Sequence, residues 1–392
     1  MKNIIYLDNA ATSFPKPKDM MDAMEKYQRE IGANPGRSGH GRSIDAGRVM
    51  YAARESLARL FNIDDPLHIV LTKNATEALN IALLGSMMSG DHVITTAMEH
   101  NSVMRPLRYL EARGASLSVI TGSPFGEIDP EDIRKAFRKS TKLVIMTHAS
   151  NVTGTVMPIE DVGAFVRERE SVMFCVDAAQ TAGALPIDVE KAGIDLLAFT
   201  GHKSLYGPQG TGGLYIRKGL DKKIAPLMMG GTGSRSEFEE QPDFMPDKYE
   251  SGTPNAIGFA GLNAGLTFIF QQTLTAIRAR EESLTARFLE GLKALGDDVT
   301  VYGPNDPSRQ TAVVSFNLKN FSSSDAALYF EEEHGILCRP GLHCAPSAHR
   351  VIKSFPQGTV RFSFSFFNTS MDVDAAIYAV QSLMLMGYKK RT

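Results

Sequence analysis

The chain has 392 residues, of which 43% are apolar and 22% are charged, and its formal net charge is −2. A chain of this length and composition can bury a sizeable globular core. The near-zero charge gives no basic field that would attract nucleic acid or an anionic membrane, and no apolar run approaches the roughly 20 residues of a membrane span. We therefore expect a small-molecule substrate, with no nucleic-acid or membrane partner.

The cysteines and the first residues indicate where the protein works. Cys175, Cys338 and Cys344 are too few, and odd in number, for a disulfide framework. The chain reaches Asp8 too soon for a signal peptide. These features predict a reducing, cytoplasmic location, and we expect no metal site.

Short apolar strands alternate with helical stretches along the first part of the chain. In chain order, strands are expected at 69–71, 91–95, 117–120, 143–147, 173–177, 196–200 and 213–216. Most of these runs are apolar without interruption, which suits strands that helices cover on both faces. The pattern predicts an α/β fold with a mostly parallel central sheet wrapped by helices.

The last third of the chain is expected to form a second, smaller unit. A helix over 263–294 would lead into an α+β domain that ends with a strand over 359–367 and a closing helix. We predict a large domain of residues 13–262, and a small domain made of residues 1–12 and 263–392.

Polar side chains follow several of the expected strands. In parallel α/β sheets, ligands bind beyond the carboxyl ends of the strands. We therefore expect Asp177 and the turns at 74–76, 99–100 and 200–203 to meet in one crevice.

Lys203 lies in a glycine-bounded turn directly after the strand at 196–200. A partly desolvated lysine amine can attack a carbonyl and form a Schiff base, whereas a solvated loop lysine is the ordinary alternative. Asp177 favours the first interpretation. A carboxylate at the end of an apolar strand needs a compensating cation, and a protonated pyridine nitrogen is such a cation.

The segment 72–77 follows a strand and opens the helix expected over 75–88. Backbone amides and the Thr76 hydroxyl at a helix N-terminus can bind an anion. An ordinary helix cap is the alternative.

Arg361 lies in the segment 359–366, where residues alternate strictly between polar and apolar. The alternation places the arginine and the serines on one face, and a valine and phenylalanines on the other. A guanidinium can bind a carboxylate by two parallel hydrogen bonds, so Arg361 is the candidate for the substrate carboxylate. A surface salt bridge is the alternative.

Cys344 follows a glycine-containing turn and lies outside any periodic apolar segment. A reactive thiol needs exposure and nearby positive charge, which His343 and Arg339 could supply. Cys175 and Cys338 lie in or at the end of apolar runs, where cysteine behaves as a small hydrophobic residue.

These motifs together resemble the class V aminotransferase family of fold-type I pyridoxal-phosphate (PLP) enzymes. The resemblance runs from the segment 6–12 to Arg361 and 368–369. Within that family, the pattern Arg-x-Gly-x-His-Cys-Ala at 339–345 resembles the nucleophile loop of cysteine desulfurases, in the subgroup that also contains selenocysteine lyases. The resemblance implies PLP as the cofactor and a homodimer.

The resemblance also implies roles for individual residues. Lys203 would carry PLP, while Asp177 and Gln180 would keep its ring an electron sink. His100 would stack on the ring and shuttle protons. Arg361, Asn151 and Arg339 would bind the substrate. The other cofactor-binding residues that it implies lie near the phosphate or the ring, with Thr253 reaching the partner subunit: Asn74, Ala75, Thr76, Asn151, Thr200, His202 and Thr253.

Three segments differ from the family pattern or vary within it. The family usually has glycine where Asn74 stands, and asparagine is the next most tolerant residue of left-handed backbone. The segment 33–41 and the acidic stretch 237–243 could line the mouth of the active site or the edge of a dimer.

The activity that the resemblance implies is PLP-dependent desulfuration of L-cysteine. Lys203 would remove the Cα proton, and Cys344 would attack the substrate sulfur, leaving a persulfide on the enzyme and releasing alanine. The persulfide would pass to an acceptor, such as a protein that serves iron–sulfur cluster assembly or thiolation. Three alternatives remain: a selenocysteine lyase; a class V aminotransferase, epimerase or hydrolase that does not use a thiol; and a non-catalytic scaffold.

Overall fold

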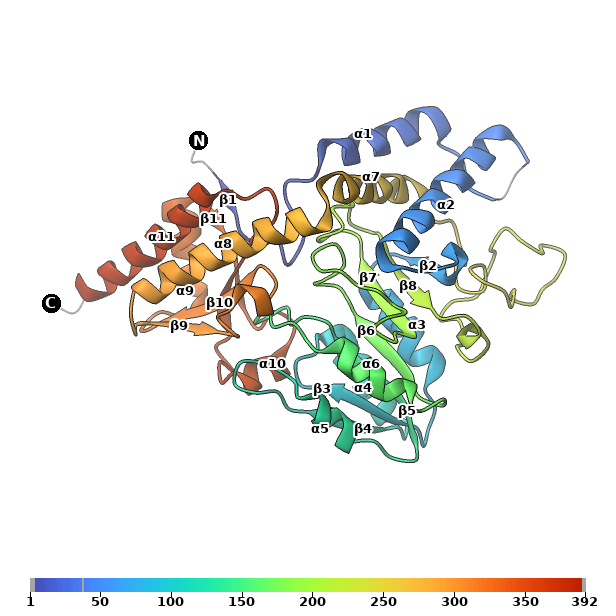
Figure 1. Cartoon of the computed structure of the whole chain (residues 1–392). Coiled ribbons are helices and arrows are strands. Elements are labelled where there is room, and N and C mark those ends of the chain that lie inside the picture. The colour runs from blue at the N-terminus through green and yellow to red at the C-terminus, as the bar shows by residue number, and fades with distance from the viewer. Residues whose placement is uncertain (1–3, 37–38, 390–392) are drawn as a thin grey trace.

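The structure, a computed structural model, describes residues 4–36 and 39–389 (Figure 1). Three parts of the predictions lie outside the described residues: residues 1–3 and 390–392 of the predicted small domain, and residues 37–38 of the segment 33–41.

A seven-stranded sheet in the order β2-β8-β7-β6-β5-β3-β4 forms the centre of the larger part. Its strands are β2 (Ile69–Thr72), β3 (His92–Thr96), β4 (Ser116–Ile120), β5 (Thr141–Thr147), β6 (Met173–Asp177), β7 (Leu196–Thr200) and β8 (Gly212–Ile216). Among them, β8 alone runs opposite in direction to the other six strands. The predicted mostly parallel sheet is confirmed, and each predicted strand is present.

Helices cover both faces of this sheet because successive strand residues point to opposite sides. Along β6, Cys175 packs into one apolar cluster with helices α3 and α4. Phe174 and Val176 pack into another cluster with α2, α6 and α7. The helices of this part are α1 (Lys18–Lys26), a π-helical turn (Tyr27–Ile31), α2 (Gly41–Phe61), α3 (Ala75–Ser86), α4 (Asn101–Glu111), α5 (Pro130–Lys135), α6 (Ile159–Arg167) and α7 (Ala256–Gln272).

A smaller α+β part lies beside the first, and α8 leads into it (Figure 1). Its antiparallel sheet has the order β12-β13-β10-β9, and β1 pairs in parallel with β11. The elements are β1 (Ile5–Tyr6), α8 (Leu274–Ala294), β9 (Val299–Tyr302), β10 (Val313–Leu318), α9 (Ser323–His334), β11 (Ile336–Leu337), β12 (Arg339–Gly341), α10 (Pro346–Val351), β13 (Thr359–Ser363) and α11 (Ser370–Lys389).

Leu7, near the start of the chain, packs into the core of this smaller part with Phe288, Phe316 and Phe362. Leu7 therefore shares one apolar cluster with residues of the last third of the chain, from Leu284 onward. The predicted division into residues 13–262 and residues 1–12 with 263–392 stays a prediction.

Two predicted elements have different bounds in the structure. The helix expected over 263–294 is two helices, because Thr273 between them adopts a φ of 66°. The Thr273 hydroxyl then accepts a hydrogen bond from the Ala276 amide (3.2 Å) and caps α8. The strand expected over 359–367 ends at Ser363, because the chain beyond it forms a turn in which Ser365 donates its amide to the Asn368 side chain (2.9 Å).

Candidate active site

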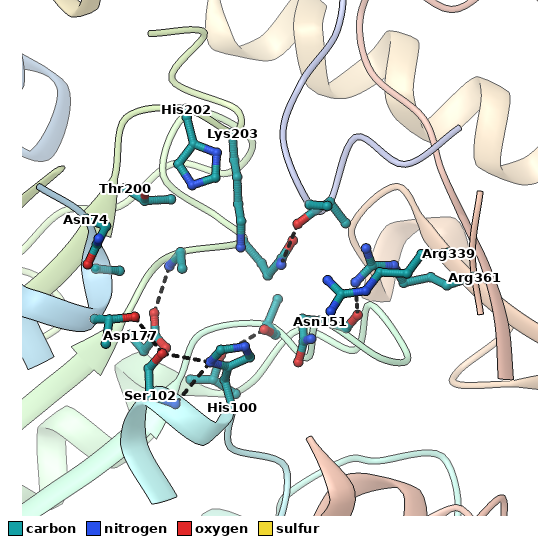
Figure 2. A pocket seen from close by; sticks show the side chains of 18 residues that line it. Asn74, His100, Ser102, Asn151, Asp177, Thr200, His202, Lys203, Arg339 and Arg361 are labelled. Carbon is teal, nitrogen blue, oxygen red and sulfur yellow. Dashed lines mark hydrogen bonds between the residues drawn. The ribbon is translucent and has the colours of Figure 1, made fainter. Parts of the chain in front are cut away.

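A cavity of about 230 Å³ lies at the carboxyl ends of β5, β6 and β7 (Figure 2). The predicted site residues that line it are Asn74, Ala75, Thr76, His100, Asn151, Asp177, Gln180, Thr200, His202, Lys203, Arg339 and Arg361. The lining residues that the sequence analysis did not identify are Ala10, Ala11, Ser102, Thr147, Ala149 and Ala179. The residues that follow the predicted strands therefore meet in one cavity, as expected. Glu99 is the exception, because its carboxyl is buried outside the cavity lining and accepts a hydrogen bond from the Thr147 amide (3.0 Å).

Lys203 follows β7 and extends into this cavity (Figure 2). Residues 12–16 bind the turn that carries it. The His202 carbonyl accepts hydrogen bonds from the Ser13 amide (3.1 Å), the Thr12 hydroxyl (3.0 Å) and the Lys16 amine (2.6 Å). Burial lowers the pKa of Lys203 to about 8, and the positive charge of Arg361 acts in the same direction. An amine with this pKa is partly unprotonated near neutral pH, as a nucleophile or a base must be.

Asp177 ends β6 and is 3% exposed. Its carboxylate accepts a hydrogen bond from the Ala179 amide (2.9 Å), and burial raises its pKa. Within residues 4–36 and 39–389, no cation lies at ion-pair distance from it. Gln180, three residues further on, donates to the Ala10 carbonyl (3.2 Å). Asp177 is therefore a buried acid whose charge is offset only by the more distant Lys203, and a bound cation at ion-pair distance would stabilise its charged form.

The N-terminus of α3 faces the same cavity. Asn74 caps this helix by accepting the Glu77 amide (2.9 Å), with a φ of −175°. The left-handed backbone expected at Asn74 is wrong, because a capping side chain requires extended backbone at its own residue. The Nδ1 atom of His202 is buried without a hydrogen-bond partner, and burial lowers the pKa of His202 to about 4. The α3 N-terminus and His202, with its unpartnered imidazole nitrogen, line the same cavity, and this combination suits an anion.

Ser102 joins two of the predicted residues. Its hydroxyl lies 2.9 Å from the His100 Nδ1 atom and 2.8 Å from the Thr76 hydroxyl. Figure 2 shows Ser102 beside His100. The Ser102 amide also donates to His100 Nδ1 (3.0 Å), so this nitrogen carries no proton. Burial lowers the pKa of His100 to about 4, which keeps the ring neutral. The position of Ser102 two residues after His100, at the start of a helix, was the sequence signal for this contact.

Arg361 lies on β13 and is 1% exposed. Its Nη2 donates to the Asp8 carboxylate (2.7 Å) and its Nη1 to the Asn151 carbonyl (3.0 Å). The predicted polar face of the strand is confirmed. The partner is a carboxylate near the start of the chain, so a buried ion pair replaces the surface salt bridge that was the alternative.

Asn151 lies beside Arg361 in the cavity wall (Figure 2). Its side-chain amide donates to the His343 carbonyl (2.6 Å). Asn151 thus contacts both the arginine and the loop that carries Cys344.

Cys344 is exposed and lines a second cavity of about 570 Å³. This cavity adjoins the first, because Thr76, His100 and Ser102 line both. The Arg339 guanidinium donates to the Cys344 Sγ (3.5 Å), which supplies the expected positive charge. The thiol therefore faces space that is continuous with the wall of the Lys203 cavity.

His343 does not supply the positive charge that the sequence analysis assigned to it. Its ring is 2% exposed and lies 3.0 Å from the Thr359 hydroxyl, and burial holds its pKa well below the ordinary range. A histidine in this setting is neutral at physiological pH. Of the other cysteines, Cys175 is buried as expected and Cys338 is partly buried.

Thr253 lies outside both cavities, at the end of the long loop between β8 and α7, and is exposed. The acidic stretch 237–243 belongs to the same loop, which extends from the body of the molecule at the right of Figure 1. The predicted contact of Thr253 with a partner subunit remains a prediction.

Over 4–36 and 39–389, no group of three or more His, Cys, Asp or Glu side chains is placed to hold a metal ion. No helix in the same part of the chain combines the length and the apolar character needed to cross a membrane.

A family model described as Aminotransferase class-V matches residues 5–376. The chain belongs to the class-V aminotransferase family. It is 34% identical to a probable cysteine desulfurase of Methanothermobacter thermautotrophicus, over 99% of this chain and 96% of the relative. It is 35% identical to a probable cysteine desulfurase of Pyrococcus abyssi, over 98% of this chain and 95% of the relative.

Solved structures give the same fold. The apo structure of a cysteine desulfurase from Thermococcus onnurineus NA1 has a TM-score of 0.90 and 35% identity, covering 97% of this chain and 94% of that one. The cysteine desulfurase CsdA of Escherichia coli, in an S-sulfonic acid form, has a TM-score of 0.84 and 28% identity, covering 97% and 94%. The predicted fold-type I architecture is confirmed.

The family depends on PLP, and the cavity fits this cofactor. The fit rests on three observations: the buried Asp177 carboxylate makes no ion pair within the described residues, the Lys203 amine has a lowered pKa, and His202, with an unpartnered nitrogen, lines the same cavity as the α3 N-terminus. A pyridinium would pair with Asp177, and an aldehyde would react with Lys203. A phosphate would bind at His202 and the α3 N-terminus.

Proposed function

We propose that the protein is a PLP-dependent cysteine desulfurase, which converts L-cysteine to L-alanine and takes up the sulfur as a persulfide on Cys344. The observation that carries the proposal is the exposed Cys344 thiol, 3.5 Å from the Arg339 guanidinium, in a cavity that adjoins the one holding Lys203. An aminotransferase, epimerase or hydrolase has no use for such a thiol. The full-length relatives named probable cysteine desulfurase support the same reaction.

The residues that would hold the cofactor divide by chemistry. Lys203 would hold the aldehyde carbon, Asp177 the pyridine nitrogen, and His100 one face of the ring. Those near the phosphate would be the α3 N-terminus and the neighbouring side chains, Asn74, Ala75, Thr76, Thr200 and His202. Bound PLP supplies an electron sink for the charge that develops on the substrate Cα.

Arg361 and Arg339 would bind the substrate carboxylate. Both guanidinium groups line the cavity, and Asp8 neutralises one of the two positive charges. A monoanionic carboxylate then meets a net single positive charge, which is the condition for a strong but reversible ion pair.

Lys203 would accept the Cα proton, because its lowered pKa leaves an unprotonated amine near neutral pH. His100 is neutral, with an Nε2 proton, and is placed to pass a proton within the cavity. The Lys203 amine takes up a proton and becomes charged, which suits it for removing protons. The neutral His100 ring is suited to relaying them.

Cys344 would attack the sulfur of the substrate as a thiolate, with the Arg339 guanidinium stabilising the negative charge. A bond forms between the two sulfur atoms as the bond between the substrate sulfur and carbon breaks. The carbon keeps the electron pair of the broken bond and takes up a proton, which yields alanine. The persulfide remains on Cys344.

We further propose that the protein is a cytoplasmic homodimer that passes the persulfide sulfur to a protein acceptor, for iron–sulfur cluster assembly or thiolation. Thr253 supports the dimer, since it is exposed and lines neither cavity of its own subunit. The exposure of Cys344 supports transfer to an outside acceptor.

The test is incubation of the PLP-loaded protein with L-cysteine, L-selenocysteine and a set of other amino acids. The proposal expects sulfide, under reducing conditions, and alanine in equal amounts from L-cysteine. Selenide and alanine from L-selenocysteine alone would make the protein a selenocysteine lyase. A keto acid, a racemised amino acid or no product from any substrate would overturn the proposal, and light scattering in solution would test the dimer.

A further inference from the structure

The loop that carries Cys344 has an unusual backbone. His343 and Cys344 are consecutive residues with φ values of 48° and 60°. Side chains with a β-carbon rarely adopt this left-handed conformation, so contacts from the surrounding structure must maintain it.

A closed ring of buried hydrogen bonds surrounds this loop. Asn151 donates its side-chain amide to the His343 carbonyl (2.6 Å), and the His343 Nε2 lies 3.0 Å from the Thr359 hydroxyl. Thr359 donates to the Ser315 hydroxyl (3.1 Å), which donates to the Val152 carbonyl (2.6 Å). Asn151 and Val152 are neighbours in the chain, so the ring closes on itself. Each member is less than 9% exposed.

The direction of the hydrogen bonds in this ring fixes the tautomer of His343. The Val152 carbonyl can only accept, so Ser315 donates to it and must accept from Thr359. The Thr359 proton is then used, and its oxygen must accept from His343 Nε2. The ring of His343 therefore carries its proton on Nε2, and Nδ1, which is buried without a partner, carries none.

The same ring reaches the residue that would bind the substrate carboxylate. The Asn151 carbonyl accepts the Arg361 guanidinium (3.0 Å) while the Asn151 side chain holds the His343 carbonyl. Thr359 and Arg361 lie two residues apart on one face of β13. The arginine and the cysteine loop are thus fixed to the same residue, Asn151.

We propose that His343 is a positioning residue: its neutral, Nε2-protonated ring anchors the left-handed loop through Thr359 and Ser315, and so holds the Cys344 thiol in the cavity that adjoins the Lys203 cavity. The role of Cys344 rests on the proposed function, whereas the anchor itself is a property of the fold.

The first experiment removes one hydroxyl of the ring. Thr359→Val keeps the shape of the side chain but leaves the His343 donor unpaired, and Thr359→Ser restores the hydroxyl. Thr285→Val is the matched control, because Thr285 is equally buried but donates within α8, to the Glu281 carbonyl (2.7 Å).

Amide hydrogen exchange of residues 342–345 and the alkylation rate of Cys344 by iodoacetamide are measured on the PLP-loaded proteins. Thr359→Val is expected to raise loop exchange about tenfold, the scale of one buried hydrogen bond. It should also change the alkylation rate and lower kcat for sulfide release, with the KM for L-cysteine within about twofold of wild type, because Arg361 is untouched. Thr359→Ser and Thr285→Val should behave as wild type. Wild-type loop exchange in Thr359→Val, or an equal change in Thr285→Val, would overturn the proposal.

The second experiment reads the tautomer directly. Nitrogen-15 NMR of the histidine rings, with His343→Gln used to assign the signal, is expected to show a neutral ring protonated on Nε2. A proton on Nδ1 or a charged ring would overturn the proposal, and this measurement also decides the matter if Thr359→Val does not fold. If loop exchange responds as expected but L-cysteine yields no sulfide, the anchor is correct and the proposed function is wrong.

Discussion

The Lys203 turn and the Cys344 loop carry the two reactive groups of the site, and they are held in different ways. The Lys203 turn directly follows a central strand, and residues 12–16 bind its carbonyl groups from behind. The Cys344 loop follows the short edge strand β12, has left-handed backbone, and depends on side chains from β10, β13 and the segment after β5. Lys203, the proposed base, is thus positioned by the end of a strand in the main sheet. Cys344, the proposed nucleophile, is positioned by polar contacts with distant segments of the chain.

This difference predicts that the two reactive groups can be removed independently. Loss of Lys203 should remove the covalent attachment of PLP and the base together, whereas loss of Cys344 should leave the cofactor chemistry intact. Changes around the Cys344 loop should affect sulfur transfer before they affect cofactor binding.

The largest effect is expected for Lys203→Ala. Sulfide release should fall by about 10⁴-fold or more, because proton transfer alone contributes up to about 10⁴ and the covalent attachment is lost as well. Borohydride reduction of the PLP-loaded wild-type protein, followed by peptide mass spectrometry, should label Lys203 and should label nothing in the variant. Label on Lys16, the other lysine at this turn, would show that the wrong amine has been assigned.

Cys344→Ala is expected to lower sulfide release by about 10³-fold, since a nucleophile is lost while binding residues remain. The absorbance spectrum of bound PLP, and its change on adding L-cysteine, should persist. Cys175→Ala and Cys338→Ala are the controls, and any effect of these substitutions should be on thermal stability, through a small cavity in the core. Sulfide release from Cys344→Ala at the wild-type rate would contradict the proposed nucleophile.

Arg361→Ala should lower kcat/KM for L-cysteine by roughly 10- to 150-fold, because a charge-assisted contact of about 1.5–3 kcal/mol is removed. PLP should still bind. Arg361→Lys keeps the charge but not the planar fork, and is expected to recover only part of the loss. An unchanged apparent affinity in Arg361→Ala would assign the carboxylate to Arg339.

The pH dependence gives the smallest effect and concerns the Lys203 turn alone. Burial lowers the pKa of Lys203 to about 8, so the unprotonated, reactive fraction of its amine falls as the pH drops below that value. The rate at which the apo protein forms its PLP adduct should therefore rise with pH, with a midpoint near pH 8 and a plateau about one pH unit higher, well below the ~10.4 midpoint of an ordinary lysine. Asp177→Asn removes the charge that raises this pKa, so the midpoint should move to lower pH. A midpoint near 10 would mean that the amine is solvated.

The features that the sequence predicted correctly are mostly local. Apolar runs such as 173–177 form strands because their side chains must be buried on both faces, and the first polar residues after them reach the strand ends by geometry alone. Lys203, Asp177 and Thr76 were found in this way. These residues could be placed at one edge of the sheet without knowledge of contacts between distant segments.

The features that it missed depend on partners far away in the chain. Asp8 pairs with Arg361 across more than 350 residues, and the neutrality of His343 depends on burial under Thr359 and Ser315. A residue pattern does not show whether a loop histidine is buried. The sequence therefore indicated a positive charge on His343, beside Cys344, whereas the buried ring is neutral. The prediction of left-handed backbone at Asn74 was wrong for a related reason. The hydrogen bond by which its side chain caps α3 decides its conformation.

Peptide mass spectrometry after brief exposure of the PLP-loaded protein to L-cysteine tests the central claim most directly. The account predicts one additional sulfur atom on the peptide that contains Cys344, removed by a thiol reductant and absent from the peptides that contain Cys175 and Cys338. Alanine formation with no added sulfur on Cys344, or with the sulfur on another cysteine, would contradict it.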